Sequence, residues 1–134
     1  MATAKIQYQG NLRTEATHLK SSNSLITDAP LDNNGKGEAF SPTDLVATAL
    51  SSCMITIMGI KARDKGIDIT GVSSEVTKIM ASNPRRIEEI IVTLRMPAIE
   101  ISDSDKALLE TVAKACPVAK SIHPDIKQTV TFFW

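Results

Sequence analysis

The stretch FSPTDLVATALSSCM, residues 40–54, is the most informative part of this 134-residue chain. It opens with a strong helix start, because Ser41 suits the N-cap position and Pro42 suits the first helical turn. Asp44 stands three residues after Ser41, where its carboxylate can accept hydrogen bonds from free backbone amides. The sequence therefore predicts a long helix that starts after Ser41 and stops at Gly66, since glycine is favoured just beyond helix ends.

This predicted helix carries apolar residues on almost every face, which is typical of a helix in the interior of a protein. We expect one stripe along it to be the most deeply buried, and Cys53 lies on that stripe. Its members are Val46, Ala49, Leu50, Cys53, Ile57 and Ile60. The charged residues at 61–65 mark the point where the helix should reach water.

The segments on either side of the helix have the periodicity of strands and of one further helix. We expect strands at 4–9, 12–17, 24–27, 67–80, 87–96 and 128–134, a loop at 28–41 and a helix at 102–115. Pro117 should end the second helix and begin a short third one. The order of elements predicts an α+β fold in a single domain, residues 1–134, and a chain of this size can bury one core.

The composition excludes several classes of protein. Fifteen Lys and Arg residues balance 15 Asp and Glu residues, and this zero net charge argues against a nucleic-acid partner. Two cysteines are too few for a disulfide scaffold. The N-terminus lacks the apolar core of a signal peptide, and the apolar run at 45–60 is short for a membrane span. We therefore expect a cytoplasmic protein with reduced thiols and no membrane partner.

Metal and cofactor sites have no signature in the sequence. The two cysteines, Cys53 and Cys116, and the two histidines, His18 and His123, show no ligand-pair spacing. The glycines of the 28–41 loop do not form a phosphate-binding motif. The expectation is no metal and no cofactor.

Cys53 is open to two interpretations. A lone cysteine inside a helix is most often a small, inert core residue. A reactive Cys53 would need help, because about 3% of an ordinary thiol is ionised at pH 7 and the helix dipole acts only within the first turn. The helping cation must come from another segment. The candidates are Arg13, Arg63, Arg85, Arg86, Arg95 and several lysines, and composition does not choose among them.

Cys116 precedes Pro117 at the expected helix break. A residue before proline is pushed out of helical geometry toward extended values, which also suit an N-cap. The sulfur of Cys116 is therefore placed near the free amides of the short helix that follows, unless the residue is simply a packed core cysteine.

Two motifs in this sequence resemble those of one known family. Residues 40–54 resemble the central-helix cysteine motif of the OsmC/Ohr family of osmotically inducible and organic hydroperoxide resistance proteins. Residues 115–121, ACPVAKS, resemble that family's second cysteine motif, and the likeness extends along almost the whole chain. The resemblance implies an intertwined α+β homodimer, with two long helices at its core and active sites drawn from both subunits.

The same resemblance implies a Cys-based hydroperoxide reductase. Cys53 corresponds to the peroxidatic cysteine and Cys116 to the resolving one, so that a Cys53–Cys116 disulfide would form during turnover. Arg13, the only arginine before the cysteine helix, matches the residue that pairs with the thiolate and would stabilise the departing alkoxide. Leu50 and Met54 would favour an organic, apolar hydroperoxide over an inorganic one. The implied reductant is a dithiol, on a lipoylated or thioredoxin-like protein.

One position departs from the family pattern. The family's peroxidases have a glutamate ten residues before the reactive cysteine, and Thr43 stands there in this chain. Two alternatives to a peroxidase therefore stay open. The first is a redox-sensing or small-ligand-binding dimer of the same family with little turnover, and the second is a structural protein with two inert core cysteines.

Overall fold

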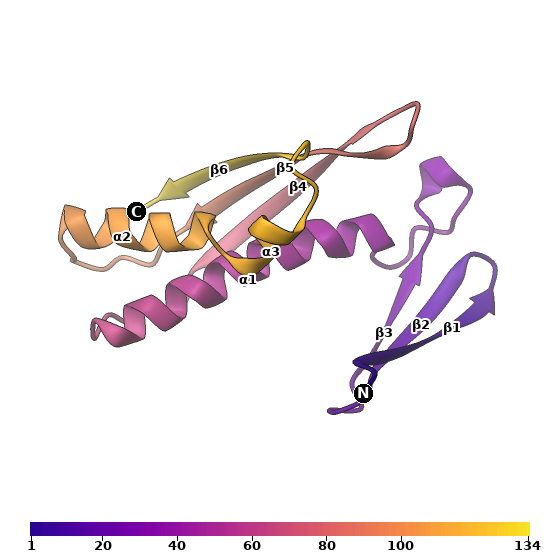
Figure 1. Ribbon diagram of the computed structural model, residues 1–134, viewed down its shortest axis with the longest axis horizontal. Helices are drawn as coiled ribbons and strands as arrows, with labels where there is room; N and C mark the ends of the chain where they lie inside the picture. The colour runs from indigo at the N-terminus through magenta and orange to yellow at the C-terminus, as the bar shows by residue number, and fades with distance from the viewer. The chain divides into compact units, whose positions relative to one another are not determined.

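The computed structural model describes residues 1–134, whose contacts group into two compact units, residues 1–46 and 47–134. Each unit contains one three-stranded sheet, and helices accompany the sheet of the second unit, which gives the α+β composition predicted from the sequence. The prediction of a single domain over residues 1–134 stays a prediction. Figure 1 shows the order of the elements along the chain.

The first unit is an antiparallel meander, as predicted. Its strands are β1 (Ala4–Gly10), β2 (Arg13–His18) and β3 (Ser24–Asp28), in the order β1-β2-β3. The β1–β2 turn places Gly10, Asn11 and Leu12 at positive φ, a conformation that glycine and asparagine adopt most readily. The loop after β3 contains one short 3-10 turn, η1 (Leu31–Asn33).

Helix α1 (Pro42–Asp64) begins and ends where the sequence predicts. The Asp44 amide donates to Ser41 Oγ at 3.1 Å, and the Ser41 amide donates to Asp44 Oδ2 at 2.9 Å. These reciprocal bonds form a capping box. At the other end Gly66 has a φ of +69°, and the Ile67 amide donates to the Ala62 carbonyl at 2.8 Å, which closes the helix in a Schellman-type turn.

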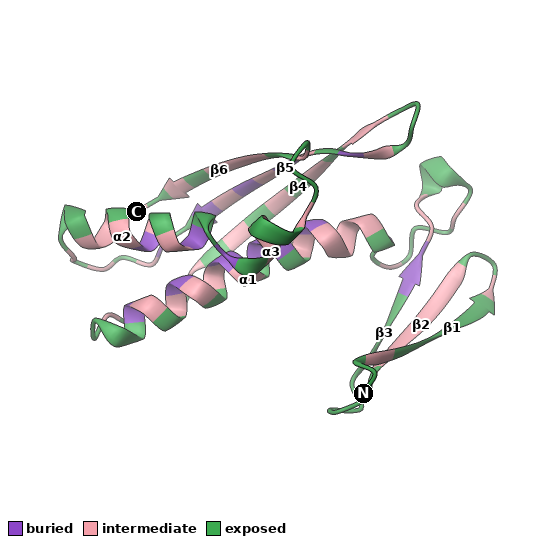
Figure 2. Ribbon diagram, in the orientation of Figure 1, coloured by how far each residue is buried: buried purple, intermediate pink, exposed green.

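The predicted buried stripe of α1 is wrong. The buried residues are Ala47, Leu50, Ser51, Met54, Met58 and Ala62. Of the predicted stripe only Leu50 is buried, whereas Cys53 is half-buried and Ile60 is 53% exposed. A helix that is apolar all round has no periodic signal that selects a face. The packing surface selects it instead, and Figure 2 shows burial confined to one side of α1.

Helix α1 is also long and apolar enough to cross a membrane by length and composition, with a mean hydropathy of 1.6 over its most apolar window. That 18-residue window is longer than the apolar run at residues 45–60. The core helix of a water-soluble protein meets the same criterion, and 33% of the window is buried within this chain. The criterion is therefore weak evidence for a membrane span.

The second sheet has the order β4-β5-β6. Its strands are β4 (Ser73–Ala81), β5 (Arg86–Arg95) and β6 (Lys127–Phe133). The predicted β4–β5 hairpin is antiparallel, and β6 pairs with β5 in parallel. The expected start of β4 at residue 67 is wrong, because the Val72 amide bonds to the Ile69 carbonyl in a turn and Gly71 has a φ of +97°. The strand starts only beyond that turn.

Two helices complete the second unit. Helix α2 (Asp103–Lys114) has Ser102 as its N-cap, and Ser102 Oγ accepts from the Asp105 amide at 3.1 Å. Helix α3 (Pro117–Ser121) follows directly, as Pro117 predicts. Lys65, at the end of α1, pairs with Asp105 of α2 at 2.9 Å.

Candidate active site

Cys116 occupies the N-cap of α3, in the geometry that the following proline predicts. Its φ and ψ are −65° and 155°, and its Sγ accepts a hydrogen bond from the Ala119 amide at 3.4 Å. The side chain is wholly buried. The break between α2 and α3 thus presents one shielded sulfur, held by a backbone donor.

Cys53 and Cys116 come together in the second unit. Cys53 lies on α1, about three turns beyond the helix start, and its side chain is close enough to Cys116 to raise the pKa of that thiol. Both cysteines are free thiols, and Cys53 is the more accessible because it is half-buried. Two neighbouring free thiols are the arrangement from which a disulfide can form.

The surroundings of Cys116 control its ionisation. Burial raises the pKa of the Cys116 thiol, and the neighbouring Cys53 raises it further. The amides of Ala119 and Val118 act in the opposite direction, because they stabilise the thiolate. The balance keeps the pKa of Cys116 above its usual value, so this sulfur is protonated at neutral pH.

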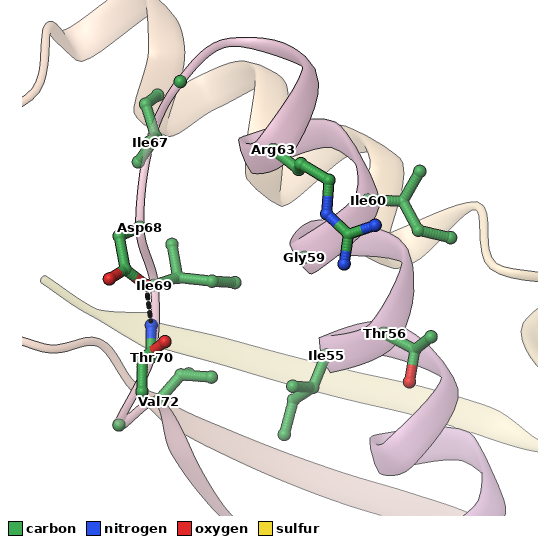
Figure 3. A pocket seen from close by; sticks show the side chains of 12 residues that line it. Ile55, Thr56, Gly59, Ile60, Arg63, Ile67, Asp68, Ile69, Thr70 and Val72 are labelled. Atoms are coloured by element: carbon green, nitrogen blue, oxygen red, sulfur yellow. Dashed lines mark hydrogen bonds between the residues drawn. The ribbon is translucent and has the colours of Figure 1, made fainter.

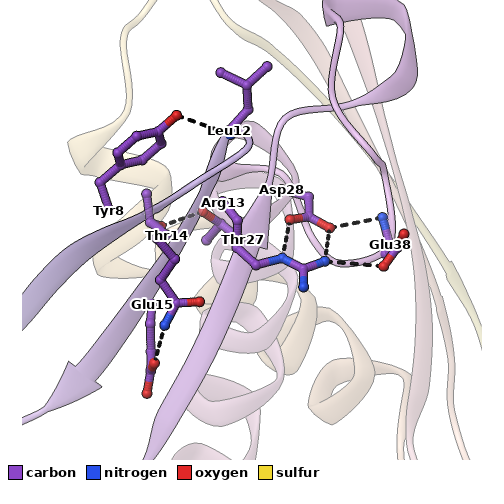
Figure 4. Close-up of polar contacts among 9 residues, drawn as sticks. Tyr8, Leu12, Arg13, Thr14, Glu15, Thr27, Asp28 and Glu38 are labelled. Carbon is purple, nitrogen blue, oxygen red and sulfur yellow. Dashed lines mark hydrogen bonds and ion pairs between the residues drawn. The ribbon is translucent and has the colours of Figure 1, made fainter.

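Arg13 belongs to the first unit, where it begins β2. Its Nε donates to Asp28 Oδ1 at 2.7 Å, and its Nη2 donates to Asp28 Oδ2 at 2.8 Å (Figure 4). Glu38 accepts a further bond from Nη2 at 3.2 Å. Sequence analysis missed both carboxylates. Only the strand register carries a signal for Asp28, since antiparallel pairing of β2 with β3 places Arg13 opposite Asp28.

The structure also places the other residues that the sequence offered as substrate contacts or as cations for Cys53. Leu50 and Met54 are wholly buried in the core, so the expectation that they contact an apolar substrate is wrong. Arg95 stacks its guanidinium over the Phe133 ring, 5.0 Å from the centroid, and Arg63 lines a separate pocket. The chain holds no cluster of three His, Cys, Asp or Glu residues that could bind a metal ion.

A pocket of about 610 Å³ lies between the second half of α1 and the loop at residues 66–72. Its lining is mainly apolar, from Ile55, Ile60, Ile67, Ile69 and Val72. Figure 3 shows Arg63 and Asp68 among these side chains, with Asp68 Oδ1 accepting from the Thr70 amide at 2.9 Å. Neither cysteine lines this pocket, so it is distinct from the thiol pair.

Comparisons with known proteins agree on one family. The sequence model of the OsmC-like protein family matches residues 35–131. None of the curated proteins matches the chain at a significant level. A solved structure from Psychrobacter arcticus 273-4, described as a candidate osmotic stress induced and detoxification response protein, is 57% identical. It covers 98% of this chain and 96% of its own, with a TM-score of 0.94.

More distant structures share the fold. An organic hydroperoxide resistance protein OsmC from Legionella pneumophila is 15% identical and has a TM-score of 0.77, covering 100% of this chain and 98% of its own. A candidate organic hydroperoxide resistance protein from Vibrio cholerae, with captopril in one of its active sites, is 18% identical. Its TM-score is 0.71, and it covers 98% of this chain and 92% of its own. The chain therefore belongs to the OsmC-like protein family.

Proposed function

We propose that this protein is a thiol-dependent peroxidase that reduces organic hydroperoxides. The proximity of Cys53 to Cys116 carries the proposal, because it brings together two residues about 60 positions apart in the sequence. The names of the Legionella and Vibrio relatives point to the same substrate class. Inorganic peroxide is a second substrate of the same chemistry.

The oxidative half of the cycle uses both sulfurs. The Cys53 thiolate attacks the terminal oxygen of the hydroperoxide, the O–O bond breaks, and the alkoxide takes a proton and leaves as an alcohol. Cys53 is then a sulfenic acid. Cys116 attacks the Cys53 sulfur and displaces water, so that two thiols and one hydroperoxide give one disulfide, one alcohol and one water.

Arg13 is the cation proposed to pair with the Cys53 thiolate and to stabilise the departing alkoxide. A guanidinium is always charged and presents several donors in a fixed plane, so it suits both tasks. Three of its N–H···O bonds go to Asp28 and Glu38 through Nε and Nη2, and Nη1 takes no part in them. A donor edge thus stays available for a second anion.

The reductive half of the cycle needs an external dithiol, on a lipoylated or thioredoxin-like protein. The dithiol attacks the Cys53 sulfur, which is half-buried, because Cys116 is wholly buried. Cys116 leaves as a thiolate that the Ala119 amide stabilises, and the second thiol of the reductant then releases Cys53. The dithiol thus supplies the two electrons that the hydroperoxide took, and it leaves as a disulfide.

We also propose an intertwined homodimer in the cytoplasm. Large apolar side chains stay exposed on both units of the single chain, and Ile6, Tyr8, Leu25, Phe40 and Ile60 are examples. Exposed apolar surface of this extent is typical of a protein–protein interface. Size-exclusion chromatography with light scattering tests the dimer, and a monomer at micromolar concentration would contradict it.

The decisive experiment measures consumption of cumene hydroperoxide by the purified protein with dihydrolipoamide in excess. Wild type should turn over many times and Cys53→Ser should not react, whereas Cys116→Ser treated with the peroxide in the absence of dithiol should stop at a sulfenic acid that dimedone traps. Consumption by Cys53→Ser as fast as by wild type would overturn the proposal. A wild-type reaction that stops after one equivalent, with dithiol still present, would instead identify a redox sensor.

A further inference from the structure

Asp28 holds Arg13 through a buried, two-point ion pair. The two residues face each other across β2 and β3, and both oxygens of Asp28 accept from Arg13, at 2.7 and 2.8 Å. The Asp28 side chain is 1% exposed, whereas that of Arg13 is 25% exposed. A two-point pair fixes the plane of the guanidinium as well as its position.

Glu38 ties the following loop to the same pair. Its backbone amide donates to Asp28 Oδ2 at 3.1 Å, and its carboxylate accepts from Arg13 Nη2 at 3.2 Å (Figure 4). The Asp28 amide in turn donates to the Phe40 carbonyl at 3.1 Å, directly before the cap of α1. Because Glu38 is 64% exposed and Asp28 is not, Asp28 is the stronger anchor of the two.

Arg13, Asp28 and Glu38 all keep their charges at neutral pH. The Arg13 guanidinium lowers the pKa of Asp28 by donating hydrogen bonds to its ionised carboxylate, so Asp28 stays ionised throughout the neutral range. Asp28 and Glu38 raise the pKa of Arg13, so its charge never varies. The two carboxylates therefore determine the direction in which the remaining donors of Arg13, on Nη1, point.

We propose that Asp28, with Glu38 as a second contact, is a positioning residue that orients Arg13 for the thiolate and alkoxide of the peroxidase reaction. This inference rests on the proposed function, and it adds the residues through which the arginine acts. A free arginine side chain has many rotamers, and holding one of them in advance lowers the entropy that binding an anion costs. Asp28 touches neither substrate nor sulfur in this role.

The test is a double-mutant cycle on kcat/KM for cumene hydroperoxide, with dihydrolipoamide saturating. Asp28→Asn keeps the shape of the side chain and removes its charge, and we expect it to lower kcat/KM about 10-fold. Arg13→Ala should lower it at least as much, and the double variant should match Arg13→Ala. Glu15→Gln is the matched control, because Glu15 lies on β2 with Arg13 but accepts from Gln9 instead; its activity should equal that of wild type.

A merely structural role gives a different pattern. Asp28→Asn would then lower kcat/KM by the same factor whether or not Arg13 is present, and that result overturns the inference, as does an unchanged kcat/KM in Asp28→Asn. If Asp28→Asn fails to fold, Glu38→Gln replaces it in the test. Glu38→Gln should lower kcat/KM by a smaller factor, and it should have no effect on kcat/KM when Arg13 is already replaced by alanine. Wild-type protein that shows no turnover refutes the proposed function instead.

A second readout does not depend on activity. The Arg13 Nε–H should give a slowly exchanging signal in nitrogen-15 NMR of the wild-type protein, because it is bonded to a buried carboxylate. The signal should be lost or exchange faster in Asp28→Asn and persist in Glu15→Gln. An equal exchange rate of the Arg13 Nε–H in wild type and Asp28→Asn would contradict the ion pair between Arg13 and Asp28.

Discussion

Oxidising the two thiols should stabilise the folded protein strongly. One equivalent of cumene hydroperoxide is expected to join Cys53 to Cys116, since the two thiols are neighbours, close enough for Cys53 to raise the pKa of Cys116. The bond closes a loop of about 64 residues, for which the chain-entropy relation gives about 4 kcal/mol of stabilisation. Strain in the closed disulfide would subtract from this value, and we expect a net gain of about 3 kcal/mol.

Urea unfolding followed by circular dichroism measures the effect. For a domain of this size the dependence of unfolding free energy on urea is about 1.5 kcal/mol per molar, so a gain of about 3 kcal/mol moves the midpoint by about 2 M. Reduced and oxidised samples must be compared at one protein concentration, because association also shifts the midpoint. Mass spectrometry should show the loss of two hydrogens within one chain.

Cys116→Ser is the matched control for this prediction. Treated with the same peroxide, it should gain oxygen on Cys53 and leave the midpoint almost unchanged, because no loop is closed. Two results would refute the reasoning: an intramolecular disulfide that leaves the wild-type midpoint where it was, or treated wild type that contains no intramolecular disulfide.

Substitutions at three further positions test the fold and the ion pair between Arg13 and Asp28. Leu50→Ala, which empties a wholly buried position of α1, should lower the free energy of unfolding by about 2–5 kcal/mol in urea, and a loss under 1 kcal/mol would contradict the packing. Ser102→Ala removes the acceptor for the Asp105 amide and should cost about 1 kcal/mol in the same assay, whereas Ser102→Gly should cost less. Asp28→Asn should be less stable than wild type at pH 7, because Arg13 stabilises the ionised carboxylate. Since the pKa of Asp28 is lowered in the folded state, this difference should shrink as the pH falls below about 4, and a difference that grows toward acid would contradict the pairing.

Local signals predicted the parts of the fold that depend on neighbouring residues. The start of α1 follows from Ser41 and Asp44, which bond to each other across one helical turn. Its end follows from Gly66, and the N-cap geometry of Cys116 follows from the proline after it. Each of these features is decided within about four residues of chain, so the sequence alone can specify it.

The sequence alone could not predict features that depend on residues far apart in the chain. The buried face of α1 is selected by what packs against it, and an all-round apolar helix offers no preference. The proximity of Cys53 to Cys116 depends on how α1 and α3 are placed together in the second unit. Likewise, Asp28 opposes Arg13 only because β2 and β3 pair in one register. Resemblance to a family named the sulfurs and the arginine, but it did not name the carboxylates that hold the arginine.

The difference between the two sulfur environments orders the steps of the proposed cycle. Cys116 is wholly buried and its pKa is raised, so at neutral pH it is a protonated thiol and a poor competitor for peroxide. It stays reduced until a sulfenic acid forms on the neighbouring Cys53. Cys116 then has to lose only one proton before it attacks that electrophilic sulfur. The Ala119 amide favours that ionisation and later favours Cys116 as the leaving group. If Cys116 were as accessible as Cys53, both sulfurs could react with peroxide, and the chain would then carry two oxidised sulfurs with no thiol left to resolve them.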